Sequence, residues 1–548
     1  MPDKTDVAII GGGLSGLVAA FEATKRGRKV VLIDQEGPQS LGGQAFWSLG
    51  GLFMIDTPEQ RRMGIRDSRA LAEQGWLGSA GFDRAEDAMP QAWASAYLDF
   101  AAGPMRTYLQ EIGMRWFPVV GWAERGGGAA DGHGNSVPRF HITWGTGEGI
   151  IAPFVQLARE AEATGQLQFA FRHRVTELVA TDGRITGVHG EVLAEDEAVR
   201  GASTTREVTG SFEIEAENVI VASGGIGGDH NKVRALWPTD RLGPAPDRMV
   251  AGVPDYVDGQ MQEIAKAAGA DAINEDRMWH YCEGVQNWNP IWPNHGIRIL
   301  PGPSSIWFDA QGNRMEAPCL PGFDTLSTLR RILSTGHSHS WFILTQKIIE
   351  KEFALSGSEQ NPDLTSGKWS AVLKERLGKG VTRAVEAFKD NGADFVVAQT
   401  LDALVDEMNR LTPNTPLDPT HLHAQIAARD AQLNNPFAKD AQIIAIRQAR
   451  AYRGDKLIRT AKPHAILDPE NGPLIAVRLN ILTRKSLGGL HTDLEARALR
   501  SDGSVLEGLL AAGEVAGFGG GGYHGYNALE GTFLGGCVFS GLKAGQSA

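Results

Sequence analysis

The segment "DVAIIGGGLSGLVAAFEATKRGRKVVLID", residues 6 to 34, decides the fold of the N-terminal part of the chain. An apolar run is followed by three spaced glycines, a helical small-residue stretch and a second apolar run. This order predicts a strand, a tight turn, a helix and a parallel strand. In such a unit Gly11 permits the turn, Gly13 lets the backbone approach a pyrophosphate, and Gly16 lets the helix pack against the sheet.

The residues that follow these glycines extend the pattern to a dinucleotide site. At the start of the helix, the backbone N–H groups of Leu14 and Ser15 point toward the phosphates. Asp34, followed by Gln35, stands where a carboxylate accepts hydrogen bonds from ribose hydroxyls and repels a 2′-phosphate, so FAD or NAD is favoured over NADP. Further glycine-rich patches favour the longer ligand, FAD, and lie at 42–51, 145–149, 223–228, 488–489 and 513–536.

The composition is that of an ordinary globular protein. The 548 residues are 42% hydrophobic and 22% charged, with a formal net charge of −12. This length predicts two lobes, and the acidic balance without a long basic block argues against nucleic acid or an anionic membrane as partner. No apolar run approaches the length of a membrane span and the N-terminus leaves no room for a signal peptide, so we expect a cytoplasmic protein with no transmembrane segment.

The three cysteines, Cys282, Cys319 and Cys537, lie far apart and form no C-x-x-C pair. Neither a disulfide framework nor a metal site built from cysteine is therefore expected, and we predict no bound metal.

The texture of the sequence changes in the middle of the chain. A strand pair around a D-G turn (174–188) and strands at 217–225 and 508–514 continue the N-terminal unit, whereas residues 230 to 435 are rich in Pro and Trp loops and charged helical segments. We expect one domain formed by residues 1–275 and 436–548, with a second domain at 276–435 inserted into it.

Five motifs in order carry a resemblance to a known family: "GGGLSGLVAA", "LGGQAFWSLGG" (41–51), "ASGGIGG" (222–228), "SLGGLHTD" (486–493) and "GLLAAGEVAGFGGGGYHGYNALEGTFLGG" (508–536). The chain resembles the flavoprotein superfamily of fumarate reductase, succinate dehydrogenase and 3-ketosteroid dehydrogenase, most closely the actinobacterial FAD-binding dehydrogenases predicted to act on ketosteroids. The resemblance implies an α/β fold: a Rossmann-like FAD-binding domain of the glutathione-reductase type with an inserted α+β capping or substrate domain.

The resemblance also implies where the cofactor lies. The second motif would run along the flavin, Val175 would face the adenine, "ASGG" would cover the pyrophosphate side, and Glu514 would bind the ribityl hydroxyls. The expected FAD contacts are Gly11, Gly13, Leu14, Ser15, Gly16, Asp34, Gln35, Gly42, Gly43, Gln44, Ser48, Gly50, Gly51, Val175, Ala222, Ser223, Gly224, Gly513, Glu514, Asn527, Gly531, Thr532 and Leu534.

Several residues depart from the family pattern. Gln44 stands where succinate dehydrogenases carry the histidine that tethers their flavin, so FAD should be non-covalent. Fumarate reductases read roughly H-G-x-N-R-L-G-G-N where this chain has "HGYNALEGT", and Ala528 replaces the arginine that clamps a substrate carboxylate. Their histidine pair is replaced by Arg484 and Lys485. A dicarboxylate substrate is therefore not favoured.

The glycine-rich stretch 521–536 lets the backbone approach the pyrimidine edge of a flavin, and a helix starting near Gly531 would stabilise negative charge there. Ketosteroid dehydrogenases use tyrosines on this loop, with one from the cap, to polarise a carbonyl and remove a proton. Tyr523 and Tyr526 would serve here, in either order, with Tyr281 from the other lobe. His524 would contact substrate, or hydrogen-bond the flavin or backbone.

Three functions remain open. The leading one is an oxidoreductase that moves a hydride between flavin N5 and a carbon adjacent to a carbonyl, forming or reducing a C=C bond in a 3-ketosteroid-like apolar substrate, with an unidentified electron acceptor. The second is a flavin-dependent reductase of a small unsaturated acid, held by Arg484 or Arg139. The third is a non-catalytic flavin binder. Dimerisation through the FAD domain is common in such enzymes, so a homodimer is possible.

Overall fold

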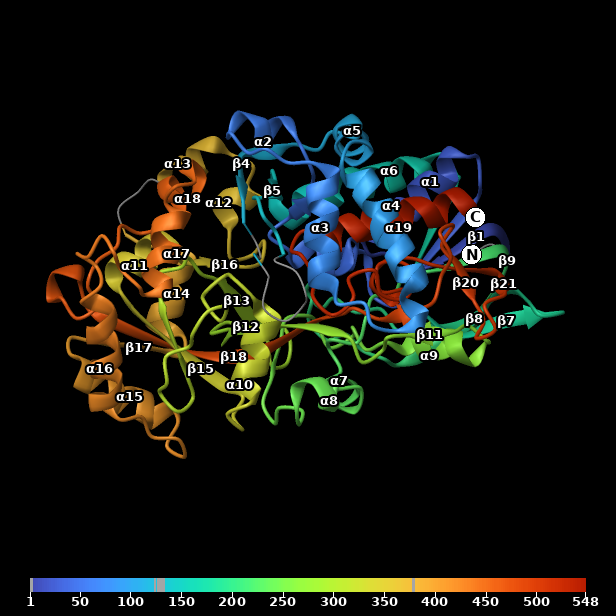
Figure 1. The fold of residues 1–548 in the computed structure, drawn as a ribbon. Coiled ribbons are helices and arrows are strands. Elements are labelled where there is room, and N and C mark those ends of the chain that lie inside the picture. Colours follow the sequence, from blue (N-terminus) through green and yellow to red (C-terminus); the bar gives the residue numbers. More distant parts are fainter. Residues whose placement is uncertain (1–2, 123–124, 126–133, 377–379) are drawn as a thin grey trace.

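The computed structural model describes residues 3–122, 125, 134–376 and 380–548. Two sheets organise it, each with its own helices (Figure 1). The first sheet is built on the predicted N-terminal unit: β1 (Lys4–Ile10), α1 (Leu14–Lys25) and β2 (Val30–Asp34). β1 pairs in parallel with β2 on one side and with β9 (Val208–Val221) on the other. The nearly continuous burial of β1 and β2 is typical of parallel strands covered on both faces.

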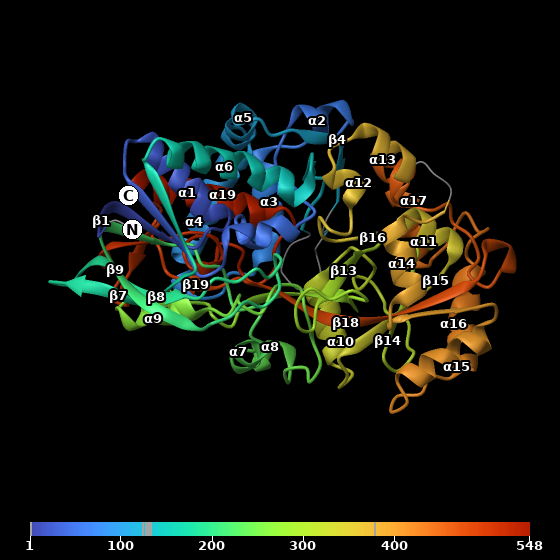
Figure 2. The same ribbon diagram turned by 180° about the vertical axis from the view of Figure 1, so that it is seen from behind.

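The strand order of the first sheet is β20-β21-β9-β1-β2-β6, and β7 and β8 form a hairpin that joins β9. The predicted strand pair corresponds to this hairpin. Helices α1, α6 and α19 pack together over one face, where the N- and C-terminal parts of the chain meet (Figures 1 and 2). The remaining bounds are β6 (Leu167–Phe171), β7 (His173–Thr181), β8 (Arg184–Leu193), β20 (Arg497–Leu499), β21 (Val505–Ala511), α6 (Thr146–Ala163) and α19 (Thr532–Ser547).

The second sheet has the order β14-β15-β18-β12-β13-β16, with β10 and β17 also paired to β18. Its strands are mostly antiparallel and carry the helices α10 to α18 at the other end of the molecule (Figure 2). The bounds are β10 (Val250–Ala251), β12 (Met278–Gln286), β13 (Gly296–Leu300), β14 (Ile306–Asp309), β15 (His339–Thr345), β16 (Ala354–Leu355), β17 (Phe395–Ala398), β18 (Leu474–Ser486), α10 (Thr325–Leu333), α11 (Gln346–Glu352), α12 (Pro362–Thr365), α13 (Trp369–Arg376), α14 (Arg383–Asn391), α15 (Leu401–Leu411), α16 (Pro419–Asp430), α17 (Ala441–Ala449) and α18 (Arg453–Ile458).

β18 links the expected domains. Its residues fall within 436–548, which we assigned to the FAD-binding part, yet it is an inner strand of the second sheet. The same strand ends at Arg484, Lys485 and Ser486. Arg484 and Ser486 lie beside Gly227 and Gly225, in the glycine-rich turn that follows β9. The exact bounds of the two domains stay a prediction.

The fold class is the predicted one: a mixed α/β structure with a Rossmann-like unit and a second part rich in antiparallel strands. The segments between β2 and β6 include several that pack on α6, on α19 or on one another: β3 (Gly51–Phe53), α2 (Pro58–Arg62), α3 (Arg69–Ala80), α4 (Ala88–Ala101), α5 (Pro104–Glu111), β4 (Trp116–Gly121) and β5 (Phe140–Thr143). Within the described ranges, no helix is long and apolar enough to cross a bilayer.

Candidate active site

A cavity of about 1150 Å³ runs from the glycine turn after β1 to the helices of the second part. At one end it is lined by the β1–α1 turn, the end of β2 and the start of β7. At the other end it is lined by β4, α11, α13 and α18. The 43–51 segment, the end of β18 and the N-terminus of α19 form its middle. The cavity thus joins the glycine turn after β1 and the glycine-rich patches at 42–51, 223–228 and 513–536 to the second part, whereas the patches at 145–149 and 488–489 do not line it.

The β1–α1 turn requires glycine, because a side chain on Gly11 would collide with the neighbouring backbone. The backbone there borders the cavity without a side chain in between. Gly11 has φ +108°, and a Cβ on it would lie 2.5 Å from the Ala222 carbonyl oxygen. Gly13 caps α1 and lines the cavity with Leu14 and Ser15, so the unpaired N–H groups of the first helical turn face this space. This is the arrangement that binds a pyrophosphate.

Asp34, at the end of β2, lines the same end of the cavity. Its two oxygens accept hydrogen bonds from the backbone N–H groups of Gly12, at 2.7 Å, and Glu36, at 2.9 Å. Burial raises the pKa of the Asp34 carboxyl to about 6, and the two backbone donors partly oppose the shift. At neutral pH Asp34 is therefore an oriented carboxylate with lone pairs left for ribose hydroxyls.

A buried polar cluster forms the middle wall. The Lys485 ammonium donates to Gln44 Oε1 at 2.7 Å and to Glu514 Oε2 at 3.2 Å, and the Ser486 backbone N–H donates to Glu514 Oε1 at 2.9 Å. Burial lowers the pKa of Lys485, while the Glu514 carboxylate opposes that shift. Cys537, on α19, lines the cavity beside this cluster, and burial raises the pKa of its thiol to about 12. The thiol is therefore protonated at neutral pH.

The N-terminus of α19 reaches the cavity through Gly531, Phe533 and Leu534. Gly531 is the N-cap with φ +90°, and a Cβ on it would lie 2.7 Å from the Phe53 backbone nitrogen. Only glycine fits this position without strain. The helix therefore begins at the cavity wall, as predicted, with its positive end toward the cavity.

Most of the predicted cofactor residues line the cavity, and five do not. A Cβ on Gly16 would meet the Gly11 carbonyl oxygen, so Gly16 serves helix packing, and Gly42 and Gly513 likewise lie behind the lining. The Thr532 hydroxyl contacts the His524 ring inside the protein. Asn527 is buried, and its side chain has no hydrogen-bond partner among the described residues. The predicted residues in the lining are Gly11, Gly13, Leu14, Ser15, Asp34, Gln35, Gly43, Gln44, Ser48, Gly50, Gly51, Val175, Ala222, Ser223, Gly224, Glu514, Gly531 and Leu534.

Tyr281, on β12, lines the cavity from the side of the second part, and two charged residues accompany it there. The Arg298 guanidinium lies 3.8 Å from the centre of the Tyr281 ring, donates to Glu530 Oε1 at 2.8 Å and donates to Glu283 Oε2 at 3.3 Å. Burial, reinforced by the Glu530 carboxylate next to the phenol, raises the pKa of Tyr281 well above its ordinary value. Tyr281 is thus a neutral phenol in contact with a carboxylate.

Tyr523 and His524 lie in the core and not in the cavity lining. The Tyr523 hydroxyl donates to the Thr532 carbonyl at 2.6 Å, and its ring packs edge-on against Trp76. His524 stacks on the same indole and its Nε2 lies 2.8 Å from Thr532 Oγ1. Both side chains hold the glycine-rich loop to α3, and their placement does not support the predicted contact with flavin or substrate.

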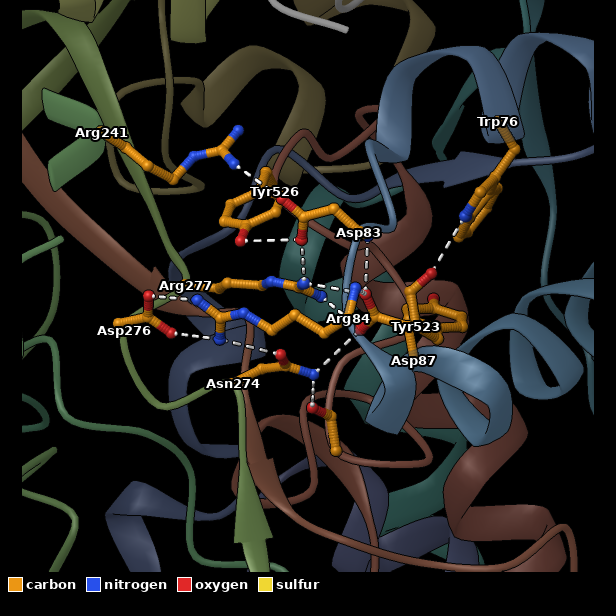
Figure 3. Close-up of polar contacts among 11 residues, drawn as sticks. Trp76, Asp83, Arg84, Asp87, Arg241, Asn274, Asp276, Arg277, Tyr523 and Tyr526 are labelled. Carbon is orange, nitrogen blue, oxygen red and sulfur yellow. Dashed lines mark hydrogen bonds and ion pairs between the residues drawn. The ribbon is translucent and has the colours of Figure 1, made fainter. Parts of the chain in front are cut away.

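Tyr526 points into a cluster of charges on the opposite side of that loop (Figure 3). Its hydroxyl donates to Asp83 Oδ1 at 3.0 Å, and its ring lies 3.3 Å from the Arg241 guanidinium and 4.0 Å from that of Arg277. It lines a separate hollow of about 400 Å³. The structure therefore brings only Tyr281, of the four predicted catalytic residues, to the large cavity.

The cavity also contains residues that sequence reasoning missed. Arg298 lies on β13, in a Pro- and Trp-rich stretch that we expected to form loops. Glu530 stood in the predicted loop, where the fumarate reductase pattern has glycine, and this departure was the available signal. Tyr256 and Arg174 line the end near Asp34 with no motif to mark them, although Arg174 adjoins the predicted Val175.

The two arginines proposed to bind a carboxylate are placed differently. Arg139 is buried against Asp67, with an N–O distance of 2.7 Å, and is not part of the lining. Arg484 does line the cavity and donates to the Gly252 carbonyl. None of four tryptophans of the middle region lines the cavity: Trp279, Trp292 and Trp307 are buried in the cores, and Trp288 is exposed outside the lining.

Comparison with known proteins agrees with these observations. The "FAD binding domain" family model matches residues 6–534. A "KsdD-like steroid dehydrogenase" of Mycobacterium tuberculosis (strain ATCC 25618 / H37Rv) is 56% identical over 543 residues, which cover 99% of this chain and 95% of that protein. A protein of the same description from Mycolicibacterium smegmatis is 56% identical over 529 residues, 96% of each chain.

Solved structures share the fold at low identity. The 3-ketosteroid delta1-dehydrogenase from Sterolibacterium denitrificans, in complex with 1,4-androstadiene-3,17-dione, has a TM-score of 0.67 at 16% identity, with 100% of this chain and 99% of that chain covered. The 3-ketosteroid-delta4-(5alpha)-dehydrogenase from Rhodococcus jostii RHA1 has a TM-score of 0.64 at 18% identity, covering 99% and 96%. The chain belongs to the FAD-binding family defined by that model and, within it, groups with the KsdD-like steroid dehydrogenases.

Proposed function

We propose that this chain is an FAD-dependent dehydrogenase that forms or reduces a C=C bond next to a carbonyl in an apolar, 3-ketosteroid-like substrate. The observation that carries the proposal is the single cavity that joins a dinucleotide cradle to a wall bearing Tyr281, Arg298 and Glu530. The 56% identity to proteins described as KsdD-like steroid dehydrogenases supports the substrate class.

The residues present fit FAD. The backbone cradle at Gly11 and Gly13 suits a pyrophosphate, Asp34 offers oriented carboxylate oxygens for a ribose, and the N-terminus of α19 suits the negative end of a reduced flavin. Bound FAD would supply the hydride acceptor or donor. Gln44 offers no nucleophile, and the nearby Cys537 is held as a thiol, so we propose non-covalent binding. Flavin released into the supernatant by acid precipitation is the expected result.

Tyr281 is the residue we propose to bind the substrate carbonyl. Because its pKa is raised, its hydroxyl keeps its proton at neutral pH and donates a hydrogen bond to the carbonyl oxygen. Negative charge that develops on that oxygen is stabilised by this donor and by the Arg298 guanidinium over the ring. The Glu530 carboxylate lies next to the phenol, and it can accept a proton that is released in this part of the site.

The lining on the substrate side is largely apolar. Phe117, Val119, Phe140, Ile142 and Leu300 contribute to it, between the flavin cradle and the second part. An apolar wall favours a fused-ring ligand because burial of its hydrocarbon surface is the main driving force for binding. A small acid would gain little there.

The second candidate remains a reductase of a small unsaturated acid, because Arg484 lines the cavity. In that case reduced enzyme should be reoxidised by fumarate, crotonate or urocanate in stopped-flow measurements. We expect no reoxidation by these acids, since the arginine clamp of the family pattern is Ala528 and the Arg298 charge is matched by two carboxylates.

The deciding experiment uses the purified yellow protein under anaerobic conditions with a panel of 3-ketosteroids. Bleaching of the flavin band by a saturated ketone, or turnover with an artificial electron acceptor, is expected. A protein without a flavin band contradicts the cofactor assignment. A flavoprotein that neither steroids nor unsaturated acids reduce or reoxidise would be the non-catalytic flavin binder.

A further inference from the structure

One end of the cavity opens at the surface of the second part. The lining residues that are exposed there, which we call the cap mouth, are Pro118, Lys347, Glu350, Lys351, Trp369, Leu373, Gly380 and Ile458. Most of them come from α11, α13 and α18; Pro118 lies on β4, and Gly380 follows α13. Figure 1 shows these three helices near one another in the part of the molecule far from both termini.

Large apolar side chains stand in solvent at this mouth. Trp369 is 52% exposed, Leu373 is 51% exposed and Ile458 is 43% exposed, and Leu457 beside it is 56% exposed. Trp369 is also held in place, because its ring packs 4.6 Å from that of Trp144. Exposed apolar residues scattered singly are ordinary, but a group of them around one opening marks an interaction surface.

The exposed charges on the three helices of the mouth are mostly cationic. On α11, α13 and α18, which are described throughout, together with Lys368 just before α13, the exposed cations are Lys347, Lys351, Lys368, Lys374, Arg453 and Lys456, and the exposed carboxylate is Glu350. Glu375 is half-buried and lies 3.5 Å from Arg383, and Asp455 is buried against Arg125. This positive surface belongs to a chain whose net charge is −12.

We propose that the cap mouth docks on an anionic lipid surface. Trp, Leu and Ile side chains that project between lysines and arginines are the composition of segments that lie in a bilayer interface, where the apolar groups enter the acyl boundary and the cations meet the headgroups. The overall acidity of the chain argued against such a partner, but the fold gathers cations at one place that the sequence disperses over a hundred residues.

The location of this surface connects lipid docking with access to the cavity. The helices that would rest on the lipid also form the entrance of the cavity, so an apolar molecule dissolved in the bilayer can pass into the cavity without crossing water. The docking itself rests on the surface alone. Its role in delivering a substrate rests on the proposed function.

The test measures flotation of the intact FAD-loaded protein with vesicles of phosphatidylcholine containing 30% phosphatidylglycerol, and with pure phosphatidylcholine, at about 0.1 and 1 M salt. We expect binding to the anionic vesicles that weakens at high salt. Trp369→Ala/Leu373→Ala should weaken it at least tenfold. The matched control Trp288→Ala/Leu77→Ala, which removes equally exposed residues outside the mouth, should bind as wild type.

A second pair of variants separates the charge from the apolar group. Lys374→Glu/Lys456→Glu should abolish the preference for anionic vesicles, and Lys25→Glu/Arg26→Glu, on the first part, should leave it intact. These residues are exposed, so folding is retained even where the apolar variant fails to fold; FAD content and the melting temperature check this.

Three outcomes overturn the proposal: no flotation, equal binding to both vesicle types, or binding that the cap mouth variants do not alter. A dimer in light scattering that Trp369→Ala/Leu373→Ala dissociates would also overturn it, because the surface would then be covered by a second copy of the chain. Flotation does not depend on turnover. A failure to oxidise steroids would therefore leave the docking result unaffected, and the reverse holds too.

Discussion

The sequence did not distinguish among the four candidate catalytic residues, but their surroundings in the structure differ. Tyr281 faces the cavity between Arg298 and Glu530, whereas Tyr523 and His524 are core residues and Tyr526 is held between arginines. A tyrosine on a glycine-rich loop carries no sequence signal for the side to which it points, because that direction is set by the backbone dihedrals of the glycines around it.

Tyr281→Phe should lower kcat by about 10²- to 10³-fold, the range expected for losing one hydrogen-bond donor to a developing oxyanion. FAD content should be unchanged. Tyr526→Phe is the matched control, with the same atom removed outside the cavity, and turnover within a few-fold of wild type is expected. Equal losses in both variants would argue against the role of Tyr281.

Tyr523→Phe should act on stability and not on chemistry. Its hydroxyl is fully buried and donates to the Thr532 carbonyl, so its removal leaves a buried acceptor without this donor at a cost of about 1–3 kcal/mol. Denaturant unfolding of the variant measures this cost. A normal free energy of unfolding with lost turnover would return Tyr523 to the chemistry.

Asp34 should make both apoprotein stability and FAD binding depend on pH. Its pKa is raised from 3.8 to about 6, so the charged form is disfavoured in the fold; this destabilisation is absent below about pH 4, grows as pH rises to 6 and is full above 6. Relative to Asp34→Asn, the wild-type apoprotein should therefore gain stability as pH falls from 6 to 4.

FAD affinity of the wild type should fall as pH falls from 6 to 4, since the protonated Asp34 carboxyl has less capacity to accept hydrogen bonds from a ribose. Flavin fluorescence titrations of wild type and Asp34→Asn between pH 4 and 8 check this. A pH profile that is equally steep in both proteins would assign the dependence to another group.

At the scale of the element, α19 tests the cofactor site. Gly531→Ala places a Cβ 2.7 Å from the Phe53 nitrogen at φ +90°, so it should displace the start of α19 and lower FAD content as well as the melting temperature. Gly503→Ala is a control with φ +81° and open space around it, and should cost only about 1 kcal/mol with full FAD content. Equal FAD content in both would remove α19 from the site.

The sequence predicted elements well where a local pattern fixes them. The β1–α1–β2 unit, the β7–β8 hairpin and the start of α19 follow from glycine spacing, alternation and turn residues, and most of the residues predicted to contact FAD line the cavity. Arg298 and Glu530 were missed because they meet only through the pairing of β12, β13 and the C-terminal loop, which lie far apart in the chain. Such long-range contacts leave no local trace.

At the scale of the whole molecule, the two parts share a core. The apolar cluster built on α1 and α19 includes Trp279, Tyr281 and Leu482 from the second sheet. A buried ion pair adds a charged contact: Arg277, the residue before β12, lies 2.6 Å from Asp87, the residue before α4.

We therefore expect one cooperative thermal transition, in which flavin release and loss of circular dichroism coincide. Arg277→Met should lower the free energy of unfolding by about 3–5 kcal/mol because it leaves the buried Asp87 carboxylate unpaired. Two separated transitions in the wild type would show that the parts unfold independently. The cytoplasmic location and the homodimer remain predictions.

β18 runs through the second sheet and brings Arg484 and Lys485, near its end, to the wall of the cavity. One continuous strand thus connects the second sheet to the contact between Lys485 and Glu514 in the middle of the cavity. We therefore expect that a substitution which displaces β18 within the second sheet also moves Lys485, and that it changes ligand affinity at the wall of the cavity.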